Sequence, residues 1–119
     1  MHNFQELKIW QKAMDIAEKT YQISTDFPIE EKYGLTSQIR RSAVSVPSNI
    51  AEGAGRNTDG EFKNFLGIAN GSSNELYTQL ILSYRLELVS ESTVKPLLNE
   101  LLEVQKMNYA LIQKFSKKI

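Results

Sequence analysis

The sequence predicts an all-α fold, an antiparallel up-down-up-down four-helix bundle that forms a single domain over residues 1–119. Apolar residues recur three or four positions apart in four long segments, which is the spacing of one helix face. No segment alternates apolar and polar residues as a half-buried strand does. We expect helices over about residues 4–25, 33–53, 59–88 and 93–117.

Length and composition fit one globular domain. The 119 residues are 41% hydrophobic and 24% charged, with 14 basic residues balancing 14 acidic ones. A neutral chain has no overall field that attracts nucleic acid, so any polyanion site must be a local patch. The chain has no cysteine, which excludes disulfides and thiolate sites. We expect a cytoplasmic protein without membrane association, because a signal-peptide core and a membrane-length apolar run are both missing.

The first two helices are separated by Phe27-Pro28, because proline disfavours a helical residue before it. The first helix is expected to turn one face to the core: Leu7, Trp10, Met14, Ala17 and Tyr21. The second is expected to do so with Leu35, Ile39, Ala43, Val46 and Ile50.

The third helix is expected to begin with a capping box formed by Thr58 and Glu61. Its core face is predicted to be Phe62, Leu66, Ala69, Ser73, Leu76 and Leu80. Gly71 lies in the middle of this helix, where glycine is destabilising. We therefore expect Gly71 to allow close packing against a bulky neighbour such as Trp10 or Tyr21.

The fourth helix is expected to be capped within Ser90–Thr93, with Pro96 in its first turn. It carries two apolar stripes. One stripe contains Leu97, Leu101, Val104, Leu111 and Phe115, and the other contains Leu98, Leu102, Tyr109 and Ile112. This face is wider than one core seam, so the second stripe either packs on another subunit or belongs to the core.

Catalytic and metal chemistry have little support in the sequence. His2 is the single histidine, and no Glu-x-x-His pair is present. We expect no enzymatic activity, no metal and no cofactor.

Residues 40–56 carry the candidate site. Pro47 removes a hydrogen bond to the Ala43 carbonyl inside the second helix, at about 3 kcal/mol. In a structural interpretation, Ser45, Ser48 and Asn49 hydrogen-bond the freed backbone at a kink. In a binding interpretation, the candidate nucleic-acid-binding residues form a basic patch, and glycines let the backbone approach an anion. The patch would contain Arg40, Arg41 and Arg56, and the glycines are Gly53 and Gly55.

Three segments resemble a known family: Leu35–Arg41, Ser45–Gly53 and Phe65–Ser72. The chain is similar to the small bacterial four-helix bundle proteins encoded within 23S rRNA intervening sequences. The resemblance implies a left-handed bundle that assembles as a ring-like homopentamer. It also implies similarity to the accessory variability determinant of diversity-generating retroelements, a pentameric barrel that binds nucleic acid and a reverse transcriptase. The family motif matches Gln38, Arg40, Arg41, Ser45, Pro47, Asn49, Glu52 and Gly53.

These observations predict a non-enzymatic, homo-oligomeric binding or scaffold protein that contacts RNA or DNA. A ring repeats each arginine around its axis, so a neutral chain can still build a basic patch. The alternative is an adaptor that binds a protein partner without touching nucleic acid.

Overall fold

The computed structural model describes residues 1–116 and contains four long α-helices and two short 3₁₀ turns. The elements are η1 (Phe4–Glu6), α1 (Lys8–Ser24), η2 (Ile29–Glu31), α2 (Leu35–Ala54), α3 (Asp59–Arg85) and α4 (Glu91–Ser116). The predicted end of the last helix, at residue 117, lies outside the described residues. Within these residues there is no strand, so the predicted helical fold is confirmed.

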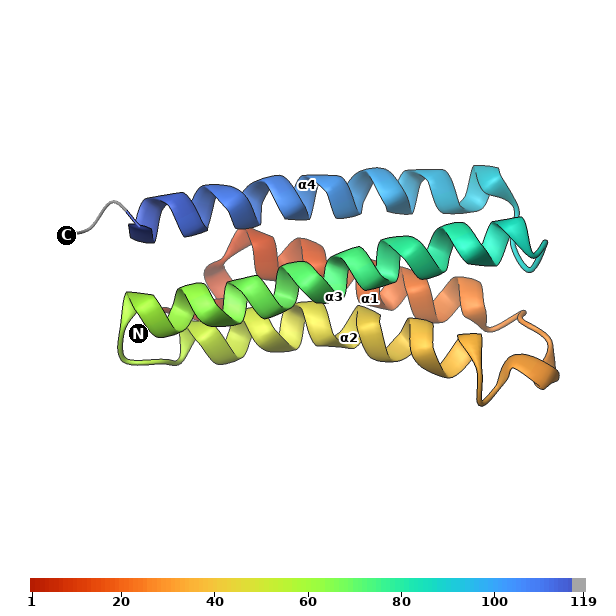
Figure 1. The fold of residues 1–119 in the computed structure, drawn as a ribbon, viewed down its shortest axis with the longest axis horizontal. Helices are drawn as coiled ribbons and strands as arrows, with labels where there is room; N and C mark the ends of the chain where they lie inside the picture. The colour runs from red at the N-terminus through yellow and green to blue at the C-terminus, as the bar shows by residue number, and fades with distance from the viewer. Residues whose placement is uncertain (117–119) are drawn as a thin grey trace.

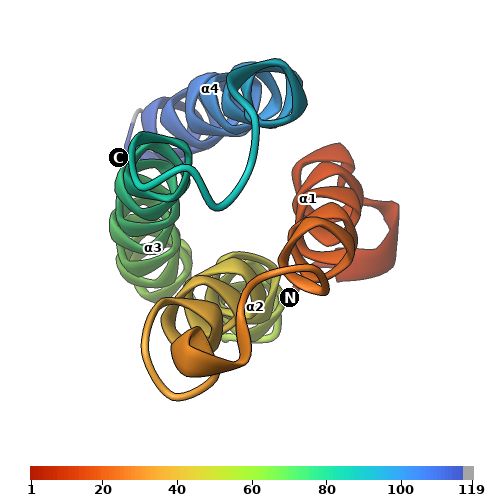
Figure 2. The ribbon, with the colours of Figure 1, turned by 90° about the vertical axis from the view of Figure 1, so that its right-hand side faces the viewer.

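The four helices run up and down along an elongated body of 49 × 23 × 20 Å (Figure 1). Seen along the bundle, each helix lies beside its neighbours in the chain, and α1 and α4 come together to close the circle (Figure 2). The most extensive contact is between α2 and α3. The N-terminus and the end of α4 lie at the same end of the bundle (Figure 1).

Two helix boundaries differ from the prediction by three residues or more. The first helix is interrupted at Leu7, whose backbone is extended and separates η1 from α1. The third helix ends at Arg85, because Glu87 adopts a left-handed conformation with φ 63°. The Leu88 amide then donates to the Ser83 carbonyl, which completes a Schellman-type ending. This ending usually contains glycine, so the sequence gives no stop signal.

The caps of α3 and α4 are at the predicted residues, although the Glu61 carboxylate accepts from the Thr58 hydroxyl rather than from a backbone amide. The Thr58 hydroxyl accepts from the Glu61 amide at 3.1 Å and donates to the Glu61 carboxylate at 3.0 Å. Ser90 caps α4 by accepting from the Thr93 amide. Because α4 therefore begins at Glu91, Pro96 lies in its second turn, and the predicted first-turn position is wrong.

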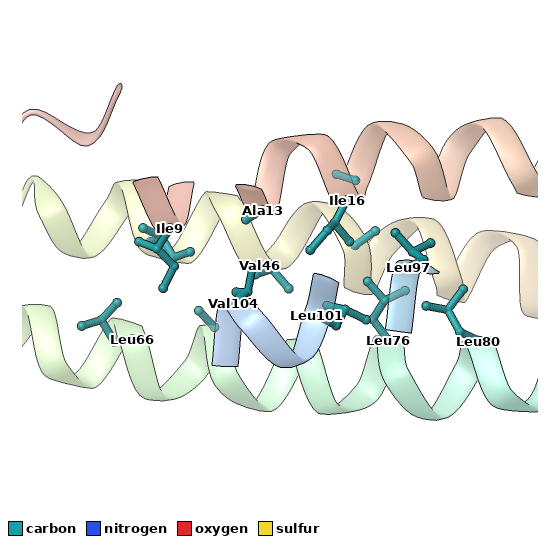
Figure 3. Packing of buried hydrophobic residues seen from close by; sticks show 14 of the residues in the cluster. Ile9, Ala13, Ile16, Val46, Leu66, Leu76, Leu80, Leu97, Leu101 and Val104 are labelled. Carbon is teal, nitrogen blue, oxygen red and sulfur yellow. The ribbon is translucent and has the colours of Figure 1, made fainter. Parts of the chain in front are cut away.

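Aliphatic side chains from all four helices fill the core (Figure 3). Every residue predicted to face the core from α2 and α3 is buried. The first stripe of α4 is also buried, apart from the half-buried Leu111. The second stripe stays partly on the surface, where Tyr109 is 66% exposed. The core position between Val104 and Leu111 holds Asn108, whose amide donates to the Leu66 carbonyl at 2.9 Å.

The predicted core face of α1 is wrong. The structure buries Ile9, Ala13, Ile16, Ala17 and Thr20, so only Ala17 of the predicted set lies in the core. Met14 and Tyr21 are each 44% exposed, while Trp10 is half-buried and packs edge-on against Phe4. Two apolar stripes compete on this helix, and the smaller side chains are the ones that face the bundle.

A close approach of α2 to α3 fixes the register of this antiparallel pair. A Cβ atom placed on Gly53 would lie 2.7 Å from the Phe65 Cβ and 2.9 Å from the Phe62 ring. Moving back along α2, the Ser45 and Ser72 hydroxyls lie 2.8 Å apart. Gly53 therefore serves helix packing, and its backbone φ is negative.

Gly71 does not have the predicted packing role. It is exposed, and a Cβ atom at this position would find no atom within 4 Å. The predicted contact of Gly71 with Trp10 or Tyr21 is therefore absent within the chain. The tight helix contact is at Gly53 instead.

Two ion pairs join α1 to α4. Lys12 Nζ lies 2.8 Å from Glu103 Oε2, and Lys19 Nζ lies 2.6 Å from Glu100 Oε1. The hydrogen bond from Lys12 and its positive charge hold the pKa of Glu103 below its ordinary value of 4.5. The same hydrogen bond and the negative charge of Glu103 raise the pKa of Lys12 above 10.5. The Lys12–Glu103 pair thus favours the charged form of both groups.

Substitution of Gly53 tests the close approach of α2 and α3. We expect Gly53→Ala to lower the free energy of unfolding by about 1–3 kcal/mol, because the added methyl group overpacks a buried contact. Gly71→Ala is the matched control, and it should raise the same quantity by roughly 0.5–1 kcal/mol through helix propensity. Urea denaturation followed by circular dichroism measures both. Equal stability of the two variants would contradict the packing described.

A titration tests the link between α1 and α4. A lowered carboxyl pKa contributes stability above about pH 4.5, which is lost as the pH falls through the folded-state value. The raised pKa of Lys12 contributes stability below about pH 10.5, which is lost as the pH rises through its folded-state value. In carboxyl-selective NMR, Glu103 should titrate below 4.5, and Lys12→Met should move its midpoint upward. An unchanged midpoint would show that the pair does not form.

Candidate functional site

The described residues hold no cluster suited to metal chemistry. No group of three or more His, Asp or Glu side chains in residues 1–116 is placed to bind a metal ion. Across the same range, no helix has the length and apolar character needed to cross a membrane. Two adjoining depressions, an apolar groove and a basic hollow, contain residues of the predicted site.

The α1/α2 groove is a shallow apolar depression of about 540 Å³ between the outer faces of the first two helices. Its residues are Trp10, Met14, Ala17, Glu18, Tyr21, Val44, Pro47, Ser48 and Ala51. Most of the α1 residues that were predicted to face the core thus line this groove. Val44 is 42% exposed, so the groove presents apolar surface to solvent.

The residues around Pro47 tie α2 to α3. The Asn49 amide donates to the Ser45 carbonyl at 2.8 Å and to the Ser45 hydroxyl at 3.0 Å, and that hydroxyl meets Ser72. Ser48 is exposed and lines the groove together with the buried Pro47. Within residues 1–116, Ser45 and Asn49 bond each other and Ser72 rather than the Ala43 carbonyl that Pro47 leaves free. The predicted compensation at the proline is therefore not what these side chains provide.

Arg40 holds the end of α1 against α2. Its Nε donates to the Ser24 hydroxyl at 2.8 Å and its Nη2 donates to the Tyr21 carbonyl at 3.3 Å. The guanidinium lies 4.8 Å from the centre of the Tyr21 ring. Since α1 ends at Ser24, Arg40 stabilises the last turn of this helix by both hydrogen bonding and charge.

Arg56 makes separate contacts beyond the other end of α2. It pairs with Glu52 at 3.1 Å and lies 4.7 Å from the centre of the Phe65 ring. Fifteen positions separate it from Arg41, which corresponds to about 22 Å along a helix axis. A single chain therefore does not bring the three predicted arginines together, and their joint role remains a prediction for an assembly.

Arg40 and Arg41 line a second depression of about 420 Å³, the basic hollow. Its residues are Tyr21, Lys32, Tyr33, Thr36, Ser37, Arg40 and Arg41. All three charged residues in this set are cationic. No acidic side chain in residues 1–116 pairs with Lys32 or Arg41. Tyr21 lines both the basic hollow and the α1/α2 groove, so the two features adjoin.

Lys32 and Tyr33 were not predicted as site residues, because the candidate site was limited to residues 40–56. An adjacent cation and aromatic residue before the Gly34 break are the signal that could have found them. Gln38 of the predicted motif is exposed on α2 but does not line the hollow. Glu52 neutralises Arg56.

Comparison with known proteins identifies relatives of this fold. A family model described as 23S rRNA-intervening sequence protein matches residues 5–110. A crystal structure of a protein with unknown function from the S23 ribosomal protein family of Bacteroides thetaiotaomicron is similar with a TM-score of 0.79. The chains are 24% identical, and the match covers 87% of this chain and 97% of that one. No curated protein matches the chain.

Alanine substitutions distinguish Arg40, which joins the helices, from Arg41, which forms no ion pair within residues 1–116. We expect Arg40→Ala to lower the free energy of unfolding by about 1–2 kcal/mol, because it removes charge-assisted hydrogen bonds and a ring contact. Arg41→Ala should change that quantity by less than about 0.5 kcal/mol. Urea denaturation checks both values. A reversed order would show that Arg41, rather than Arg40, joins the helices.

Proposed function

The chain belongs to the family of 23S rRNA-intervening sequence proteins, and we propose that it is a cytoplasmic, non-enzymatic, homo-oligomeric binding or scaffold module that contacts RNA or DNA. The observation that carries the proposal is the contiguity of an apolar groove and a hollow whose charged residues are all basic, joined at Tyr21. The apolar part suits a protein contact and the basic part suits a phosphate backbone. The cysteine-free sequence fits a reducing compartment.

A second copy of the chain is the proposed occupant of the α1/α2 groove. Exposed apolar side chains also lie on the other two helices, among them Ile68 of α3 and Leu102 and Tyr109 of α4. The pair α1 and α2 lies across the bundle from α3 and α4 (Figure 2). A contact between two different surfaces is head-to-tail, and head-to-tail contacts close into rings when the rotation allows. Five subunits are the number that the family resemblance suggests.

Assembly also explains how a chain with no net charge could bind nucleic acid. Each subunit would contribute Lys32, Arg40 and Arg41 through its basic hollow. Repetition around a ring raises the local positive charge and lets several weak contacts act together. Arg56, which one chain keeps apart from the other two arginines, would join the patch only across a subunit boundary.

The adaptor alternative uses the same groove differently. An apolar groove between two helices also suits the apolar face of a partner helix. A protein that remains a single chain and binds neither RNA nor DNA would fit this alternative.

A charged residue in the groove tests assembly and binding together. We expect light scattering to give a multiple of the 13.6 kDa chain mass for the native protein and about the single-chain mass for Val44→Glu. In fluorescence anisotropy at two salt concentrations, the native protein should bind structured RNA or duplex DNA more weakly at the higher salt. Val44→Glu should bind on the order of 100-fold more weakly because avidity is lost.

Ile29→Gln is the control for loss of an exposed apolar side chain without added charge, since Ile29 is exposed and lines neither the groove nor the hollow. It should keep the native mass and the native affinity. Helical circular dichroism verifies that each variant is folded. A native protein with the single-chain mass would exclude assembly, and no binding at low salt would exclude contact with nucleic acid.

A further inference from the structure

Tyr33 is a bare aromatic ring in the basic hollow. The residue is 88% exposed, the largest exposed fraction among the exposed large hydrophobic residues of the described chain. Lys32 Nζ lies 5.5 Å from the ring centre, so a cation accompanies the ring. Large aromatic rings gain stability when they are covered. Within residues 1–116, one chain leaves Tyr33 largely uncovered.

The charges around this ring are unopposed inside the hollow. Of the nearby carboxylates, Glu31 accepts from the Leu35 amide at 3.3 Å, where it caps α2. Asp26 lines a different depression, next to α3–α4 loop residues Leu88 and Val89. Glu30 is exposed and does not line the hollow. The hollow therefore joins a bare ring to the cations Lys32 and Arg41 without a neutralising acid among its lining residues.

Tyr21 and Arg40 form another part of the lining of the hollow. Arg40 fixes Tyr21 through its contact with the ring and through the hydrogen bonds to α1. On α2, Thr36 and Ser37 add two hydroxyls. The Thr36 hydroxyl is buried and has no hydrogen-bond partner within residues 1–116.

We propose that the basic hollow binds an unpaired nucleotide of a single-stranded nucleic acid, whose base stacks on Tyr33 and whose phosphate contacts Lys32 and Arg41. This assignment rests on the proposed function, which it narrows to a substrate class. Stacking on aromatic rings beside backbone-tracking cations is the general means by which proteins hold single strands. The volume of about 420 Å³ lies within the range of small-ligand sites.

A duplex fits this surface less well. In a paired helix the base faces are stacked on one another, so a tyrosine ring reaches a base face only after the base is unstacked. Groove reading requires a protruding helix or ribbon, whereas the charged residues here line a depression. A duplex would contact the cationic side chains of the hollow through its phosphates, without stacking on Tyr33.

The experiment uses the full-length native protein with a fluorescein-labelled 12-mer of oligouridine and an RNA duplex of the same length. We expect Tyr33→Ala to weaken oligouridine binding at least 10-fold without changing the dependence of affinity on salt, because stacking releases no counterions. Tyr33→Phe should keep affinity within about twofold, since it retains the ring. Arg41→Ala should lower the salt slope by about one for each phosphate that the arginine neutralises in the native protein.

Ile29→Ala, which removes another exposed apolar side chain near the hollow, is the control and should leave both affinities unchanged. Equal oligouridine affinities for Tyr33→Ala and the native protein would overturn the stacking site. If Arg41→Ala still weakens binding in that case, the broader function survives as a purely electrostatic contact. Binding of the duplex but not of oligouridine at low salt would overturn the single-strand site alone, whereas no binding of either RNA would overturn this site and the RNA contact of the proposed function.

Discussion

The close contact between α2 and α3 at Gly53 is the constraint on which the rest of the arrangement depends. Only a glycine lets the helix backbone approach Phe62 and Phe65 this closely. Two hydrogen-bonded pairs follow toward the start of α2 and the end of α3. Ser45 pairs with Ser72, and Ser42 pairs with Gln79 at 2.6 Å. One antiparallel register satisfies all three contacts. The inner face of α2 is thereby fully used for structure.

A fixed inner face determines what α2 presents to solvent. Arg41 and Val44 are exposed, and they lie in the basic hollow and the α1/α2 groove, respectively. The motif between residues 38 and 53 therefore mixes two roles at helical spacing. Ser42, Ser45 and Gly53 contact α3, whereas Arg41 is exposed and lines the basic hollow. This division explains why a binding interpretation and a structural one both fit the same segment.

The sequence predicted the helices and most of the core because buried positions on α2 and α3 repeat at helical spacing without a competing stripe. It failed on α1, where Ile9, Ala13 and Ile16 form a second stripe, and the choice between two stripes depends on the partner helices. It also failed at Glu87, since a left-handed residue other than glycine carries no local signal. The sequence pointed to two residues of the basic hollow and missed the others. The adjacent arginines Arg40 and Arg41 were recognisable in the sequence. Tyr33 becomes a candidate only when the structure shows its exposure and the cation beside its ring.

The central claim is that the outer face of α2 and the turn before it contact nucleic acid. Photo-crosslinking of a 4-thiouridine-substituted single-stranded RNA, followed by peptide mapping, locates the contact directly. The account predicts crosslinks at Tyr33 and Tyr21, the two aromatic residues that line the basic hollow. Crosslinks confined to α4, or distributed evenly over exposed lysines, would contradict it.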